Sequence, residues 1–207
     1  MIDEGYTKFF VIWTDREPLT VRETADLERW RKPLHDAGLV GYYEEHGIGF
    51  GNISVRAADP EQFIVSGTQT GHLATTGPQH YALVTSYDIA ANRVSCRGAV
   101  QASSESLTHA AIYELASTVG AVVHIHDLCM WNDLKSKPAS TYADIAYGTP
   151  EMADEFKRLF RETDFAETGV AAMAGHESGV VSIGRSLQEA ANRVLKLREN
   201  HARNKRG

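Results

Sequence analysis

The stretch GAVVHIHD, from Gly120 to Asp127, constrains the fold more than any other part of the 207-residue sequence. The apolar, β-branched residues near its start predict a buried strand. Residues two apart in a strand project from the same face, so His124 and His126 should project together where the strand leaves the core. Converging imidazoles suit a divalent metal, but tetrahedral zinc needs at least three protein ligands. A further ligand must therefore come from elsewhere in the chain.

A third histidine has the same setting at the end of a second apolar run. His176 ends VAAMAGH as His126 ends AVVHIH, so it can complete a three-histidine site. The alternative is a loop histidine that only forms hydrogen bonds. The other histidines considered at this point lie in expected helices or loops: His35, His201, His46, His72 and His80.

The segment QASSESLTH offers a carboxylate at the start of an expected helix. Free amide groups and the dipole at a helix N-terminus suit an anion, so Ser103 and Ser104 can help to hold a phosphate or carboxylate. Glu105 can then act as a general base. The alternative is a capping serine followed by a first-turn glutamate, which is a common stabilising arrangement.

The remaining pattern predicts a single domain over residues 1–207 with a mixed, largely antiparallel sheet covered by helices. Expected strands lie within 7–14, 51–57, 62–67, 80–98, 122–126, 169–176 and 179–184. Expected helices are 20–38 with Thr20 as N-cap, 104–117, 148–160 with Thr149 as N-cap, and 186–203. The segment DLCMWNDL follows the histidine strand, and Asp127 either orients a histidine or caps the next turn.

Composition is ordinary for a soluble globular protein, with 43% hydrophobic and 23% charged residues. No apolar run approaches the ~20 residues of a membrane span, and the N-terminal residues make a poor signal peptide. The net charge of −6, with one short basic tail, argues against nucleic-acid binding. Cys96 and Cys129 lack the spacing of a disulfide scaffold or a thiolate zinc site, so we expect a cytoplasmic protein.

Five motifs occur in an order that resembles the class II aldolase/adducin family. They are GNISVR (51–56), VSGTQTG (65–71), SSE with a histidine four residues on (103–109), VVHIH (122–126) and a late GH (175–176). The resemblance spans roughly residues 20–200. The family includes fuculose-phosphate and rhamnulose-phosphate aldolases and ribulose-phosphate 4-epimerase, and it implies a three-layer α/β/α domain around a mostly antiparallel mixed sheet.

The resemblance also implies a site for each motif. His124, His126 and His176 would hold Zn²⁺, or another divalent metal such as Mn²⁺ or Co²⁺. Glu105 would be the acid/base group, and the metal would stabilise an enediolate during cleavage of a carbon–carbon bond. The residues that match the family's phosphate site are Asn52, Ser66, Gly67, Ser103 and Ser104.

The sequence departs from the family pattern in three places. GHESG replaces the usual NHG, which inserts Glu177 and Ser178 beside the metal site. VSGTQTG lacks the proline of the aldolases' TPTG or SPSG. The segment after His126 is short, and its PASTY places Tyr142 as the candidate for the catalytic tyrosine that family aldolases contribute across a subunit interface.

The resemblance therefore predicts a lyase of carbohydrate metabolism that cleaves a small hydroxy-carbonyl compound, in particular a sugar phosphate. A 4-epimerase or a dehydratase on the same metal platform is the alternative. A non-catalytic adducin-like interaction module is disfavoured, because such modules lose the metal ligands whereas this sequence keeps three histidines and Glu105. The family further implies a homotetramer with each site lined by two chains.

Overall fold

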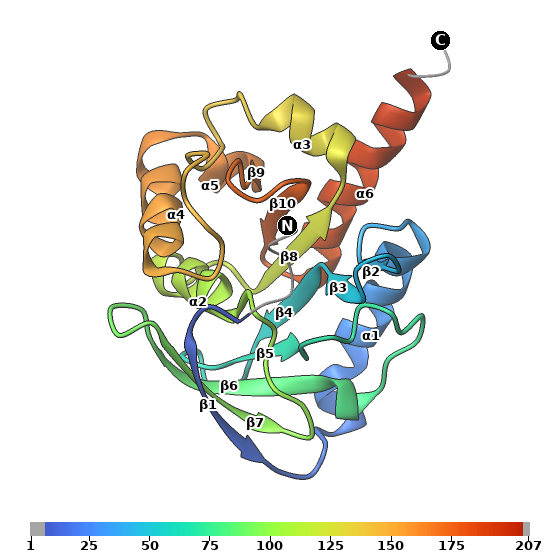
Figure 1. Ribbon diagram of the computed structural model, residues 1–207, viewed down its shortest axis with the longest axis vertical. Helices are drawn as coiled ribbons and strands as arrows, with labels where there is room; N and C mark the ends of the chain where they lie inside the picture. Colours follow the sequence, from blue (N-terminus) through green and yellow to red (C-terminus); the bar gives the residue numbers. More distant parts are fainter. Residues whose placement is uncertain (1–6, 205–207) are drawn as a thin grey trace.

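An eight-stranded sheet carries the histidine strand near its middle (Figure 1). The computed structural model describes residues 7–204. From one edge to the other the strands are β1 (Phe10–Asp15), β7 (Arg93–Gly98), β6 (Tyr81–Asp88), β5 (Phe63–Ser66), β4 (Asn52–Arg56), β8 (Ala121–His126), β10 (Gly179–Gly184) and β9 (Val170–Ala172). Within the described residues β1 and β7 form the one parallel pair, so the sheet is mostly antiparallel, as predicted.

Helices cover both faces of the sheet, which confirms the expected three-layer α/β/α arrangement (Figure 1). One face carries α2 (Ser106–Leu115), α4 (Pro150–Glu162) and α5 (Phe165–Thr168). The other carries α1 (Val21–Asp36), α3 (Leu128–Leu134) and α6 (Leu187–Asn204). A short hairpin of β2 (Gly41–Tyr43) and β3 (Ile48–Phe50) and a 3₁₀ turn, η1 (Pro78–His80), complete the described elements.

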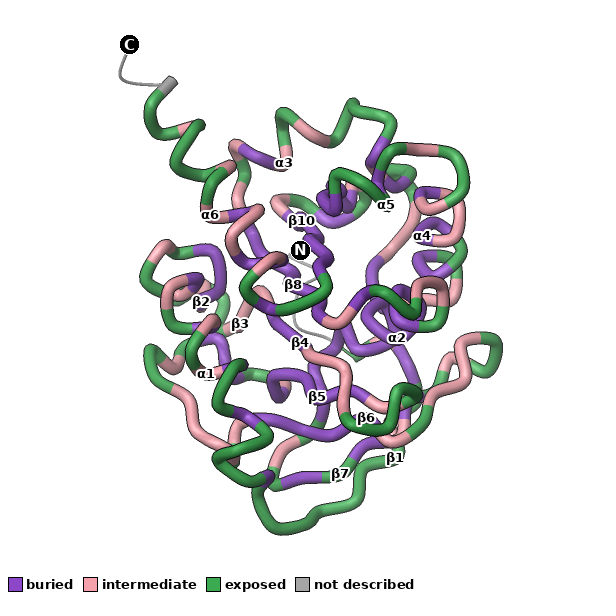
Figure 2. Tube along the Cα trace, turned by 180° about the vertical axis from the view of Figure 1, so that it is seen from behind, coloured by how far each residue is buried: buried purple, intermediate pink, exposed green. Residues whose placement is uncertain are grey.

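Strand β8 divides its side chains between the two cores. Val122 packs with α2 and α4, whereas Val123 and Ile125 pack with α1 and α6. Because side chains alternate along a strand, His124 and His126 lie on the α2 and α4 face together with Val122. Every residue of β8 is buried, and Figure 2 shows buried chain running through β8 and β10. The alternation of side chains along β8 thus places both imidazoles in the interior.

Helix starts follow the capping signals in the sequence. The Thr20 hydroxyl accepts from the Glu23 amide, and the Glu23 carboxylate accepts from the Thr20 amide, so α1 begins with a capping box. Thr149 caps α4 as predicted. Helix α2 starts later than predicted, at Ser106 and not Ser104, because a turn closed by the Ser106 amide and the Ser103 carbonyl precedes it.

The described chain has no helix with the length and apolarity of a membrane span.

A buried arginine ties α1 to the loop after β5. Arg31 is 1% exposed, and its guanidinium donates to the carbonyls of Leu73 at 2.6 Å and Thr70 at 2.8 Å. That loop continues from Gly67 of the VSGTQTG motif, so Arg31 fixes a segment that leads to the expected anion site.

Replacing Arg31 by methionine should destabilise the protein, because the carbonyls of Thr70 and Leu73 would lose their charged donor. We expect urea denaturation to show a loss of about 2–4 kcal/mol in the unfolding free energy. Arg29→Met, on the exposed side of the same helix, is the control and should change little. Equal stability of the two variants would show that the Arg31 hydrogen bonds do not hold the loop.

Candidate metal centre

Two histidines of β8 and one from a turn meet at one point. In the sheet register His124 lies opposite Asn52 of β4, and His126 lies opposite Gly179 of β10. The Nε2 atom of His126 lies 3.2 Å from Nε2 of His124 and 3.1 Å from Nε2 of His176. The structure thus brings together the three predicted ligands, all of them buried.

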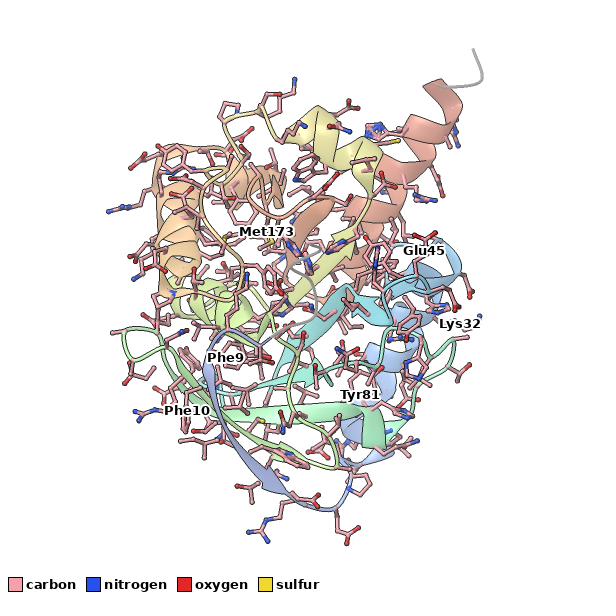
Figure 3. The ribbon with its side chains drawn as sticks, viewed as in Figure 1. Phe9, Phe10, Lys32, Glu45, Tyr81 and Met173 are labelled. Atoms are coloured by element: carbon pink, nitrogen blue, oxygen red, sulfur yellow. The ribbon has the colours of Figure 1, made fainter. Side chains whose placement is uncertain are left out.

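His176 reaches the cluster from the turn between β9 and β10. Its amide donates to the Met173 carbonyl, and the Gly179 amide donates to the His176 carbonyl, each at 2.9 Å. Figure 3 shows Met173, where the turn begins, near the ends of β8 and β10. A side chain at Gly179 would place its Cβ 2.5 Å from the His176 ring, so the ring position requires glycine there. The inserted Ser178 adopts a φ of 67°, in the left-handed region that favours glycine.

Burial keeps these rings uncharged. It lowers the pKa of His124 to about 4 and places the pKa values of His126 and His176 well below the usual 6.5. The neighbouring rings also disfavour the charged form of His126, and His124 does so for His176. Neutral imidazoles keep a lone pair for coordination, so the cluster has the protonation state that a metal ion requires.

Glu105 lies against the same rings. One carboxylate oxygen, Oε1, is 3.7 Å from Nε2 of His176 and 4.0 Å from Nε2 of His124. The residue is 2% exposed, and within residues 7–204 neither carboxylate oxygen has a hydrogen-bond partner. Burial raises its pKa to about 8, and the nearby Thr108 side chain and Lys8 charge act in the opposite direction. A buried carboxylate beside three imidazole nitrogens fits a divalent cation, which would compensate its charge.

A hydrogen-bonded network behind Glu105 fixes the helix that carries it. His109, one turn along α2, donates its amide to the Glu105 carbonyl at 3.1 Å. Its Nδ1 lies 2.7 Å from the Ser54 hydroxyl, which lies 2.8 Å from the Tyr113 hydroxyl. Burial lowers the pKa of His109 to about 3, so this ring is neutral as well. The network joins α2 to β4 and holds Glu105 in register with the histidine strand.

Two tyrosines near the cluster were not found by sequence reasoning. The Tyr43 hydroxyl, from the β2–β3 hairpin, lies 3.1 Å from Nδ1 of His126. A proton on Nδ1, donated to that hydroxyl, leaves the lone pair on Nε2, which faces the other rings. The Tyr147 ring, just before α4, lies with its centre 4.5 Å from that of His176 and is buried. Both depend on long-range packing, for which their local sequences give no signal.

The residues expected to bind an anion gather beside the cluster. Asn52 precedes Ile53 on β4, and the Ser103 amide donates to the Ser66 carbonyl at 3.1 Å. The set consists of Asn52, Ser66, Gly67, Ser103 and Ser104, and its four side chains are buried. The Asn52 carbonyl oxygen, Oδ1, has no partner among the described residues, so it is available to a ligand.

Two members of this set have structural roles already. The Ser66 hydroxyl accepts from the Ile53 amide at 2.9 Å and donates to the Ile53 carbonyl at 3.1 Å. It therefore bridges β4 and β5. The Ser103 hydroxyl accepts from the Glu105 amide at 3.3 Å, which supports the turn before α2.

The contacts of Tyr142 and Asp127 are with other residues than the three histidines. The Tyr142 side chain is 58% exposed, and its ring lies 4.4 Å from the Arg158 guanidinium. Asp127 accepts from the Met130 amide at 2.9 Å and caps α3, which confirms the capping interpretation of this residue. Helix α3 itself was not among the expected helices.

Comparisons with known proteins agree with this geometry. The profile of the Class II Aldolase and Adducin N-terminal domain matches residues 39–202. YgbL from Escherichia coli, a candidate aldolase/epimerase/decarboxylase, is 21% identical with a TM-score of 0.62 over 87% of each chain. A sugar-phosphate aldolase from Thermotoga maritima is 17% identical with a TM-score of 0.64, over 86% of this chain and 92% of that one. An L-fuculose 1-phosphate aldolase is 17% identical with a TM-score of 0.61, over 88% of this chain and 84% of that one. No curated protein matches the sequence. At these identities the structural likeness establishes the fold.

Replacing Tyr43 by phenylalanine should weaken zinc binding, because His126 would lose the hydroxyl that orients its ring. We expect a loss of about 10- to 100-fold in affinity, measured by competition with a chromogenic chelator. Tyr42→Phe, one residue earlier and with its ring against His72, is the matched control. If both variants bind zinc as tightly as the wild type, the Tyr43 hydroxyl does not set the ring orientation.

Proposed function

The chain belongs to the class II aldolase and adducin family, and we propose that it is a metal-dependent lyase that cleaves a small hydroxy-carbonyl compound. The observation that carries the proposal is the Glu105 carboxylate, buried without a hydrogen-bond partner among the described residues and 3.7 Å from a histidine of the cluster. A non-catalytic module has no use for such a group, because a buried carboxylate without a partner is destabilising. The proposed substrate is a sugar phosphate.

The three imidazoles would hold the divalent ion through their Nε2 atoms. We propose zinc, because an all-imidazole site suits it, with Mn²⁺ or Co²⁺ as alternatives. When bound, the ion supplies Lewis acidity, which stabilises negative charge that develops on a substrate oxygen. The pair formed by Tyr43 and His126 keeps one ring oriented for this role, and burial of the rings excludes competing water.

Glu105 is the proposed group that moves the proton. Glu105 is the N-cap residue of α2, and this position sets its carboxylate against the rings of His124 and His176. A carboxyl group whose pKa lies near neutrality can both accept and return a proton at physiological pH. In the cleavage direction, Glu105 would return a proton to the carbon from which the aldehyde product has departed.

The neighbouring polar set supports binding of an anionic group on the substrate. The Asn52 amide oxygen has a role in this only through a bridging donor, whereas the Ser104 backbone amide is a direct donor. The Ser103 amide already donates to the Ser66 carbonyl. A 4-epimerase would use the same groups to cleave and rejoin one bond, and a dehydratase would use them to eliminate water. Product analysis separates these alternatives from a lyase.

Glu105→Gln should keep the fold and the metal but lose the reaction, because the amide cannot carry the proton. We expect turnover to fall about 10²- to 10⁴-fold. The assay is a screen of zinc-loaded protein against phosphorylated and unphosphorylated ketoses, following release of aldehyde or dihydroxyacetone phosphate. Glu114→Gln, exposed on the same helix, is the matched control. Near wild-type turnover in Glu105→Gln would mean that Glu105 serves only the helix start.

We further propose a closed homo-oligomer, in particular a tetramer, with each site lined by two chains. Two exposed side chains near the histidine strand and its following loop support this: Leu128 is 49% exposed and Tyr142 is 58% exposed. Met130 of the same stretch is buried in its own chain, so only part of DLCMWNDL is available to a neighbour. Tyr142 is the proposed catalytic residue from the adjacent chain.

Light scattering at micromolar concentration should give a mass several times the 22.8 kDa of one chain. A mass of one chain would contradict the assembly. Mixed oligomers of Tyr142→Phe and Glu105→Gln chains should then regain activity that neither parent has, because one interface would combine the two intact residues. If subunits exchange and no activity returns, Tyr142 does not act across an interface.

A further inference from the structure

The start of β1 brings a lysine to the edge of the metal centre. The Asn92 side-chain amide donates to the Lys8 carbonyl, and the Phe10 amide donates to the Asn92 carbonyl, each at 2.8 Å. Phe9 is buried in the core that contains α2 and α4, whereas Phe10 is exposed; both are labelled in Figure 3. The backbone that follows the Lys8 side chain is therefore fixed, although Lys8 lies outside the part of the chain that matches the family profile.

The Lys8 side chain contacts the metal centre through one aromatic ring. Its Nζ lies 3.9 Å from the centre of the Tyr147 ring, and that ring is the one that packs on His176. Because Tyr147 is buried, the ammonium rests on a fixed surface. A cation on a ring face is stabilised by the ring's negative potential.

The same loop brings Lys8 close to the serine turn. Gly148 has a φ of +67°, and a side chain there would place its Cβ 3.0 Å from the Ser104 carbonyl oxygen and 3.8 Å from the Lys8 Cβ. The positive φ favours glycine at this point, where the loop lies close to both residues. Lys8, the turn at Ser103 and Ser104, and Tyr147 thus converge from three separate parts of the sequence.

We propose that Lys8 is a specificity-determining residue that binds an anionic group, a carboxylate or a phosphate, that the substrate carries in addition to its hydroxy-carbonyl pair. The inference rests on the proposed function, because it assumes that such a pair binds at the histidines. Lys8 would supply the positive charge, and the Ser104 backbone amide would supply a neutral donor.

Electrostatics support this placement. Burial raises the pKa of Glu105 and lowers that of His176; the charge of Lys8 opposes burial at Glu105 and adds to it at His176. The lysine therefore acts on both the proposed proton carrier and a proposed ligand. A second lysine in the chain rests on an aromatic ring away from the cluster: Lys135 Nζ lies 4.0 Å from the Trp131 ring. This pair provides a matched comparison for a contact that only stabilises the fold.

The test is calorimetric binding of three probes that share a hydroxyl next to a carbonyl: neutral dihydroxyacetone, dihydroxyacetone phosphate and hydroxypyruvate. Wild type, Lys8→Gln, Lys8→Arg and Lys135→Gln are compared after zinc loading and confirmation of equal metal content. Lys8→Gln should bind one or both anionic probes about 10- to 100-fold more weakly, with dihydroxyacetone unchanged. Lys8→Arg should recover much of that affinity, and Lys135→Gln should match the wild type.

The outcomes separate the two proposals. A loss confined to dihydroxyacetone phosphate identifies the group as a phosphate, and a loss confined to hydroxypyruvate identifies it as a carboxylate. If dihydroxyacetone binds and Lys8→Gln binds all three probes as the wild type does, the role of Lys8 is overturned and the proposed function stands. If the wild type binds none of the probes, the proposed function and the role of Lys8 are overturned together.

Discussion

Three uncharged imidazoles and one carboxylate are buried against one another on a single face of the sheet, and the surrounding structure is arranged to keep them there. Burial of Glu105 without a hydrogen-bond partner among the described residues is unfavourable for the protein alone. A bound cation offsets that unfavourable free energy of burial, because it compensates the carboxylate charge and uses the lone pairs of the rings. The site therefore links metal binding to the stability of β8, α2 and the β9–β10 turn.

Much of the fold and of this centre could be predicted from local sequence. The spacing of His124 and His126 placed both rings on one face, since strand periodicity is a local property. The capping residues Thr20 and Thr149 marked two helix starts correctly. The position of His176 followed from its apolar run and the family motif, and the fold brings its ring to the other two.

The missed features depend on contacts between distant segments. Tyr43 meets His126 only because a hairpin folds over the strand end, and Tyr147 meets His176 only because its loop crosses the same face. Helix α2 begins at Ser106 because tertiary hydrogen bonds hold Ser103 in a turn beside Ser66. Lys8 lies in a segment for which the sequence suggested nothing beyond a strand. The parallel pairing of β1 with β7 brings this lysine to the site.

The measurement that tests the account most directly is the metal content of tag-free protein by elemental analysis. The wild type should contain about one divalent ion per chain, with zinc predominant. The double variant His124→Ala, His126→Ala should retain almost none, and the exposed His72→Ala should match the wild type. Unchanged metal content in the double variant would contradict the central claim that these buried imidazoles hold the ion.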